Sequence, residues 1–107
     1  MARIDKVTQI VRAPAGTVIA GNVVTVVKLT AGSVVPAGTA DALGVTCPGG
    51  TIQAGYPVGI LLAGEIVEFG GTNSTKYYAQ AGGTLGSTTS PTLVGFTVEG
   101  GRLVVNM

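Results

Sequence analysis

Few side chains in this 107-residue sequence could do chemistry, and their spacing does not assemble a catalytic site. The chain has no His and one Cys, so a Ser-His-Asp triad, a His-based zinc site and an internal disulfide cannot be built. Cys47 has no His to activate its thiol, which predicts a buried structural residue. A strand would place Glu65 and Glu68 on opposite faces, whereas a glycosidase needs two carboxylates facing one bond. We therefore expect a protein that is not an enzyme and that binds no metal or cofactor.

Three Gly-Gly-Thr clusters, at residues 49–51, 70–72 and 82–84, resemble phosphate-binding loops only superficially. A phosphate loop needs a Lys followed by Ser or Thr at the start of a helix, and none of the clusters has one. A cation site made of carboxylates alone is disfavoured because the five acidic residues are scattered. These clusters therefore predict tight turns, in which glycine adopts backbone conformations that other residues avoid.

The elements that position these residues are predicted to be strands. Eighteen Gly and five Pro disfavour long helices, and apolar residues alternate or form short runs between Gly, Pro and Asn. The predicted strands are 6–12, 17–20, 23–29, 33–35, 43–47, 56–62, 65–69, 75–79, 93–98 and 102–105, with a long loop over 80–91. Both faces of 23–29 are apolar, which predicts burial on both sides or in an interface. The expected fold is all-β, a small sandwich or barrel (jelly-roll-like or β-tulip-like) of about nine short strands. We divide it into an N-terminal arm or first strand (1–12) and a single domain (13–107).

The composition points to a surface that another protein covers. Only 10% of the residues are charged, whereas 46% are hydrophobic and the net charge is +1. Six basic residues against five acidic ones argue against a nucleic-acid partner. The uncharged stretch 42–64 is interrupted repeatedly by Gly and Pro, so strands and turns are expected there and no membrane partner. A single Cys and no signal-peptide pattern indicate synthesis in a reducing cytosol.

Charge and aromatic residues mark the expected contact sites. The first 28 residues are mainly basic and residues 41–68 carry only acidic charges, a division that could orient neighbouring copies or dock the basic end on an acidic surface. The few aromatic residues are expected to be core or interface anchors, and two consecutive tyrosines on a strand must point to opposite faces. The candidate contact residues are Arg3, Ile4, Lys6, Arg12, Tyr56, Phe69, Tyr77 and Tyr78.

Four segments, at 43–46, 54–60, 63–68 and 94–101, carry a family resemblance. Their Leu-Gly-Val, Ala-Gly-x-x-Val and Val-Gly-x-x patterns resemble the capsid decoration (cement) proteins of tailed bacteriophages, over most of residues 14–107. The resemblance implies a virion protein on the outer capsid surface, made in the bacterial host cytoplasm, that binds the major capsid protein and staples neighbouring subunits. It also implies association with its own copies, as a homotrimer in the first place or as a dimer. We expect residues 2–12 to contact the capsid, as a strand added to a partner.

Two other functions remain open on the sequence. The chain could be another structural part of a virion, such as a spike, fibre or tail component, although it lacks the single repeat period of a long β-helical fibre. It could also be a carbohydrate-binding β module, although it has no Trp to form an aromatic platform.

Overall fold

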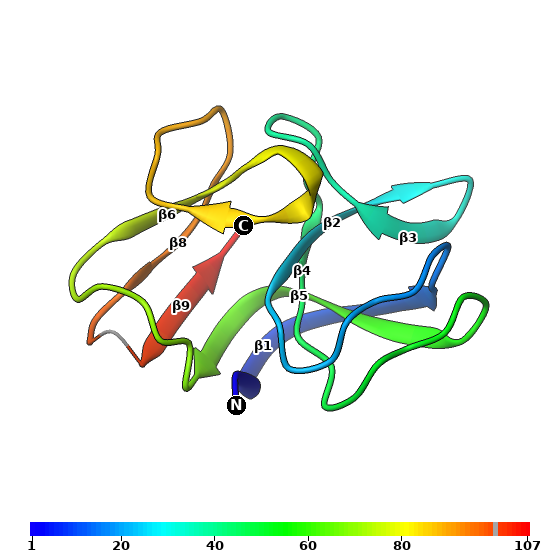
Figure 1. The fold of residues 1–107 in the computed structure, drawn as a ribbon, viewed down its shortest axis with the longest axis horizontal. Helices are drawn as coiled ribbons and strands as arrows, with labels where there is room; N and C mark the ends of the chain where they lie inside the picture. Colours follow the sequence, from blue (N-terminus) through cyan, green and yellow to red (C-terminus); the bar gives the residue numbers. More distant parts are fainter. Residues whose placement is uncertain (100) are drawn as a thin grey trace.

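A computed structural model describes residues 1–99 and 101–107, which form an all-β domain as expected (Figure 1). The strands are β1 (Arg3–Pro14), β2 (Thr25–Thr30), β3 (Ser33–Pro36), β4 (Gly44–Thr46), β5 (Pro57–Val67), β6 (Lys76–Ala79), β7 (Leu85–Gly86), β8 (Leu93–Thr97) and β9 (Arg102–Asn106). A short 3-10 turn, η1 (Ala81–Gly83), precedes β7.

All nine strands belong to one curled sheet whose strand pairs are antiparallel. Eight of them follow the order β3-β2-β4-β5-β9-β8-β6-β7, and β1 pairs with the remaining edge of β5. Figure 1 shows β2 and β3 on one side of the molecule and β6, β8 and β9 on the other, with β5 running between them. Ala15, which follows β1, forms a parallel bridge with Val34 of β3. The curl therefore brings the first strand back to the opposite end of the sheet.

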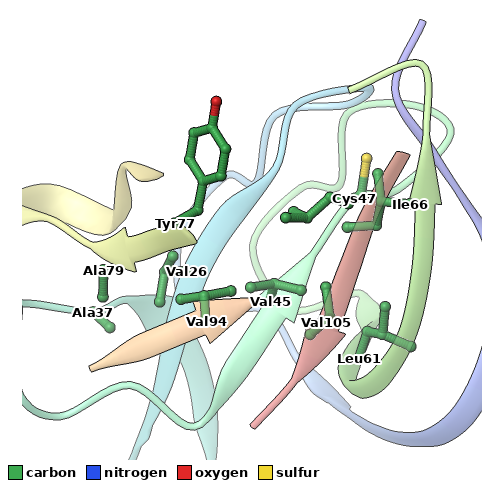
Figure 2. Close-up of a cluster of buried hydrophobic side chains, with 11 residues drawn as sticks. Val26, Ala37, Val45, Cys47, Leu61, Ile66, Tyr77, Ala79, Val94 and Val105 are labelled. Carbon is green, nitrogen blue, oxygen red and sulfur yellow. The ribbon is translucent and has the colours of Figure 1, made fainter. Parts of the chain in front are cut away.

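The buried side chains form two clusters, one on each side of the central strands. The first lies between the central strands and β6, β8 and β9, and Figure 2 shows its valines facing one another while the Tyr77 hydroxyl points away from them. The second lies inside the curl formed by β1, β2, β3 and β5. Adjacent residues serve different clusters: Val26 belongs to the first and Val27 to the second. The expectation that the run 23–29 is buried on both sides is thus confirmed for its centre.

Several predicted boundaries are wrong for identifiable reasons. Segments 56–62 and 65–69 were expected as two strands, but β5 continues through Gly64. Gly64 has a φ of 154°, and the carbonyl of Lys6 approaches it so closely that a side chain would collide with it. Segment 17–20 is not a strand, since its pairing is a single bridge from Ile19 to Ile52. The expected loop 80–91 contains η1 and β7.

The N-terminal residues are the first strand of the sheet and not an extended arm. β1 pairs with β5 from Arg3 to Pro14, with register shifts at Ile4/Lys6, Val7/Gln9 and Gln9/Ile10. These irregularities bend the pair, and a bent pair can follow the curl of the sheet. Although it is paired along its length, β1 remains exposed at almost every residue.

Candidate interaction surface

The predicted aromatic contact residues occupy three different environments. Tyr77 is 9% exposed and belongs to the first cluster, where its ring meets Phe69 edge-to-face at a centroid distance of 5.0 Å. Its hydroxyl accepts a hydrogen bond from the Thr72 amide at 2.9 Å. Tyr78 is half-buried, whereas Tyr56 is exposed in the turn before β5. Tyr77 and Phe69 therefore stabilise the core, and Tyr56 is the aromatic of this group that a partner could reach.

Most charged residues of the predicted basic and acidic segments form ion pairs with one another inside the chain. Arg3 pairs with Glu68, and Lys6 lies 3.9 Å from Glu65. Farther along, Lys28 lies 2.8 Å from Asp41. Arg3 and Lys6 are paired within the chain because antiparallel pairing of β1 with β5 brings the basic segment against the acidic one.

The ion pairs shift the protonation of several exposed groups. The chain's terminal amine and Arg3 lower the pKa of Glu68. A hydrogen bond from the Lys28 ammonium, with one from the Gly38 amide, lowers the pKa of Asp41. Hydrogen bonds to Glu99 and Glu65 raise the pKa of the Arg102 guanidinium. Each shift favours the charged form of its group, that is, of Glu68, Asp41 and Arg102.

Of the remaining β1 candidates, Ile4 is half-buried and packs against the first cluster, whereas Arg12 is exposed. No ion pair or side-chain hydrogen bond connects Arg12 to another residue within 1–99 and 101–107. Arg12 is thus the cation of β1 that remains available to a partner.

One row of residues crosses five strands on the face of the sheet that points away from the first cluster. The register pairs Lys76 with Phe96, Phe96 with Val104, Val104 with Glu65, and Glu65 with Lys6. Directly paired residues of antiparallel strands point to the same face, so these five side chains share one surface. We call this surface, from Lys76 on β6 to Lys6 on β1, the outer face.

The outer face has an apolar centre and a charged margin. Phe96 is 46% exposed, and its neighbour Val104 is half-buried. Hollows lie on both sides of Phe96, one towards β9 and β1 and the other towards Lys76 and the two residues before it. Glu65 belongs to the charged margin. Its carboxylate accepts from the Arg102 guanidinium at 3.4 Å and lies beside the Lys6 ammonium. An exposed aromatic surrounded by ordered charges is the usual arrangement of a protein-binding surface.

Phe96 is one of the few aromatic residues of the chain but was not among the predicted contact residues. Burial in β8 runs opposite to hydropathy, because the polar Thr97 is buried while the apolar Phe96 is exposed. Thr97 is buried because its hydroxyl accepts from the Thr75 amide at 3.0 Å and donates to the carbonyl of Thr72. Only the strand register shows that Phe96 points outwards, and the hydropathy of the sequence does not reveal that register.

The structure assembles no reactive cluster in the part of the chain that it describes. Cys47 is buried as predicted, and burial raises the pKa of its thiol, which keeps it protonated. Within the described ranges no group of three or more His, Cys, Asp or Glu side chains could hold a metal ion. A search of the same residues for a helix that could span a membrane finds no candidate.

Comparison with known proteins identifies a shared fold. No protein-family model matches the sequence, and no curated protein matches it. A chain in a solved structure from Mycobacterium phage Patience superposes with a TM-score of 0.84, at 17% sequence identity. The match covers 98% of this chain and 95% of that one. The two chains thus share one fold from end to end.

Proposed function

We propose that this protein is a structural component of a phage head, a decoration protein that binds the assembled capsid and staples neighbouring major capsid subunits. The observation that carries the proposal is the fold shared with the phage chain over nearly the whole length of both. The resemblance of segments 43–46, 54–60, 63–68 and 94–101 to cement proteins supports it independently. The protein is then made in the host cytoplasm and acts on the outer surface of the virion.

The outer face is the surface that we assign to the capsid. It combines Phe96 as an apolar anchor with Lys76, a cation without an ion-pair partner among the described residues. Lys6 lies at its β1 margin, which keeps one of the predicted contact residues in the site. A rigid sheet loses little conformational entropy on docking, so modest contacts repeated over a capsid lattice can stabilise the whole shell.

The proposal is tested by adding the purified protein to heads of its own phage that were prepared without it. Binding is measured by co-sedimentation, and the position of the protein is determined by cryo-electron microscopy. We expect added density at equivalent positions over the outer surface, and heads that release DNA at a higher temperature. Absence of binding to such heads would overturn the proposal, and a few copies confined to the tail would favour a tail component instead.

A matched pair of substitutions tests the outer face. Phe96→Ser is expected to weaken head binding about thirtyfold, as loss of a hot-spot residue worth about 2 kcal/mol would. Leu29→Ser removes a side chain of similar exposure (43% against 46%) from β2, away from the outer face, and should leave binding unchanged. Equal effects of the two substitutions would contradict the assignment of this face.

A further inference from the structure

A groove lies where the two sides of the curled sheet approach each other beside the first cluster. On one side β7 ends the sheet, and within the described ranges it pairs with β6 alone. On the other side lie the residues just before β2, and Figure 1 shows η1, in yellow, next to that strand. A hollow of about 430 Å³ separates residues 82–85 from residues 22–25, and Ala2 and Phe69 also line it. We call this hollow the end groove.

The wall formed by β7 presents a free backbone donor to the end groove. The Thr84 carbonyl accepts from the Gln80 amide at 2.9 Å, so it faces β6. The Leu85 amide belongs to the same peptide plane and points the opposite way, away from β6 and to the side of the groove. No other described strand pairs with β7 on that side, so the Leu85 amide has no backbone partner in the described part of the chain.

The wall formed by residues 22–25 presents a free acceptor. The Val26 carbonyl accepts from the Ala37 amide at 2.9 Å, so it faces the β3 side of β2. Carbonyls two residues apart on an extended strand face the same side, so the Val24 carbonyl does too. There η1 takes the place of β3, since a side chain at Gly83 would collide with the Val26 carbonyl. Val24 makes no backbone hydrogen bond with the described residues.

The two walls define the chemistry of an occupant. An extended peptide backbone carries donors and acceptors on both of its edges, so it can bond to both walls at once. None of the described residues that line the groove is charged, so a charged side chain would lose its hydration there without gaining a partner. The floor is apolar, because Ala2, Val24, Phe69 and Leu85 are half-buried against the first cluster. An inward-facing apolar side chain would complete the cover of that cluster.

We infer that the end groove binds an extended, uncharged segment of the capsid protein, which adds a strand between β7 and the residues before β2. In strand addition, main-chain hydrogen bonds give affinity and pockets for alternate side chains give specificity. The identity of the partner rests on the proposed function, whereas the form and polarity of the groove do not. The outer face points away from the first cluster and the end groove borders it, so the protein has two separate contacts for stapling two subunits.

Filling the end groove from within tests whether a segment enters it. Ala2→Leu should raise the melting temperature by a few degrees, because the added side chain buries apolar area in the groove. The same variant should bind heads roughly tenfold more weakly, because the segment is excluded. Ala42→Leu is the matched control, since Ala42 is also half-buried against the first cluster but does not line the groove. Its binding to heads, measured by co-sedimentation, should equal that of the wild type.

Two substitutions of Leu85 separate its backbone from its side chain. Leu85→Pro and Leu85→Ala both remove the leucine side chain, but only proline removes the amide. Thr84 has a φ of −82° and a ψ of 163°, a conformation that a following proline allows. Leu85→Pro should bind heads about fivefold more weakly than Leu85→Ala, the loss expected of one backbone hydrogen bond. Equal binding by the two variants would contradict strand addition.

Peptides identify the occupant without heads. Short overlapping peptides of the phage's major capsid protein, and a peptide of this chain's own β1, are added to the isotope-labelled protein and followed by NMR. An uncharged capsid peptide should shift the amide signals of Val24 and Leu85 saturably and slow hydrogen exchange of the Leu85 amide. Lysine in place of its inward-facing apolar residue should abolish both effects. If the β1 peptide binds and no capsid peptide does, a second copy occupies the groove and the inference is overturned.

The outcomes separate this inference from the proposed function. Heads that bind the wild type and Ala2→Leu equally well, but bind Phe96→Ser weakly, would overturn the end groove alone and leave the outer face as the capsid contact. Absence of wild-type binding to heads would overturn the proposed function, and with it the assignment of the segment to the capsid protein.

Discussion

At the scale of single residues, hydrogen bonding decides burial as much as hydropathy does. Thr97 and Thr46 are both almost fully buried, yet only Thr97 has hydrogen-bond partners for its hydroxyl. The hydroxyl of Thr46 has none among the described residues. A buried polar group without a partner opposes folding, whereas a partnered one stabilises it and holds nearby backbone groups in place. The same side chain thus has opposite effects at two positions.

We predict opposite results for the same substitution at these two sites. Thr97→Val should lower the free energy of unfolding by about 1–3 kcal/mol, because it leaves the Thr75 amide without its acceptor. Thr46→Val should leave stability unchanged or raise it, since it removes only an unpartnered hydroxyl. Urea denaturation followed by circular dichroism measures both. A larger loss for Thr46→Val than for Thr97→Val would contradict this account.

At the scale of elements, glycine allows the strands to lie close where the sheet curls. A side chain at Gly95 of β8 would collide with the backbone carbonyl of Val104 on β9. Gly64 of β5 has the same relation to the carbonyl of Lys6 on β1. Both glycines lie at crossings that set the register of the outer face. The sheet therefore keeps its curvature only while these positions lack a side chain.

Gly95→Ala is accordingly expected to destabilise the fold. The added methyl group must displace the backbone of β9, which should cost about 1–3 kcal/mol or more. Gly49→Ala is the matched control, because no heavy atom lies within 4 Å of the methyl position there, and its stability should equal the wild type. Thermal unfolding of the two variants provides the comparison, and a neutral Gly95→Ala would contradict the close approach of β8 and β9.

At the scale of the whole molecule, the central strands make the two buried clusters one cooperative unit. On β5, Ile60 belongs to the second cluster and the next residue, Leu61, to the first. Both side chains are fully buried, so neither cluster can open without moving the strand that supports the other. Although the core is divided in two, unfolding should be a single transition.

This cooperativity is tested by a substitution in the second cluster whose effect is measured in the first cluster. Val34→Ala in the second cluster should lower the free energy of unfolding by about 2 kcal/mol. Tyrosine fluorescence in a Tyr56→Phe, Tyr78→Phe background, where Tyr77 of the first cluster is the remaining tyrosine, and circular dichroism should give the same shifted midpoint. Two separate midpoints would show that the clusters unfold independently.

The sequence by itself determined the class of fold and the kinds of site that are absent from it. Alternating β-branched residues between turn residues predict strands, and local preference is strong enough for that prediction to hold. The absence of His excludes triads and His-based zinc sites in any fold. The burial of Cys47 also followed from its apolar surroundings.

Only the tertiary structure decided which surfaces face a partner. Pairing of β1 with β5 joined the basic and acidic segments, which left Asp5 and Arg12 as the charges of that strand without partners. Pairing of β8 with β6 and β9 placed Phe96 outside and Thr97 inside. Strand register is set by contacts between residues far apart in the chain, and a shift of one position reverses every side chain. Local sequence does not encode that choice, so the outer face became visible only in the folded molecule.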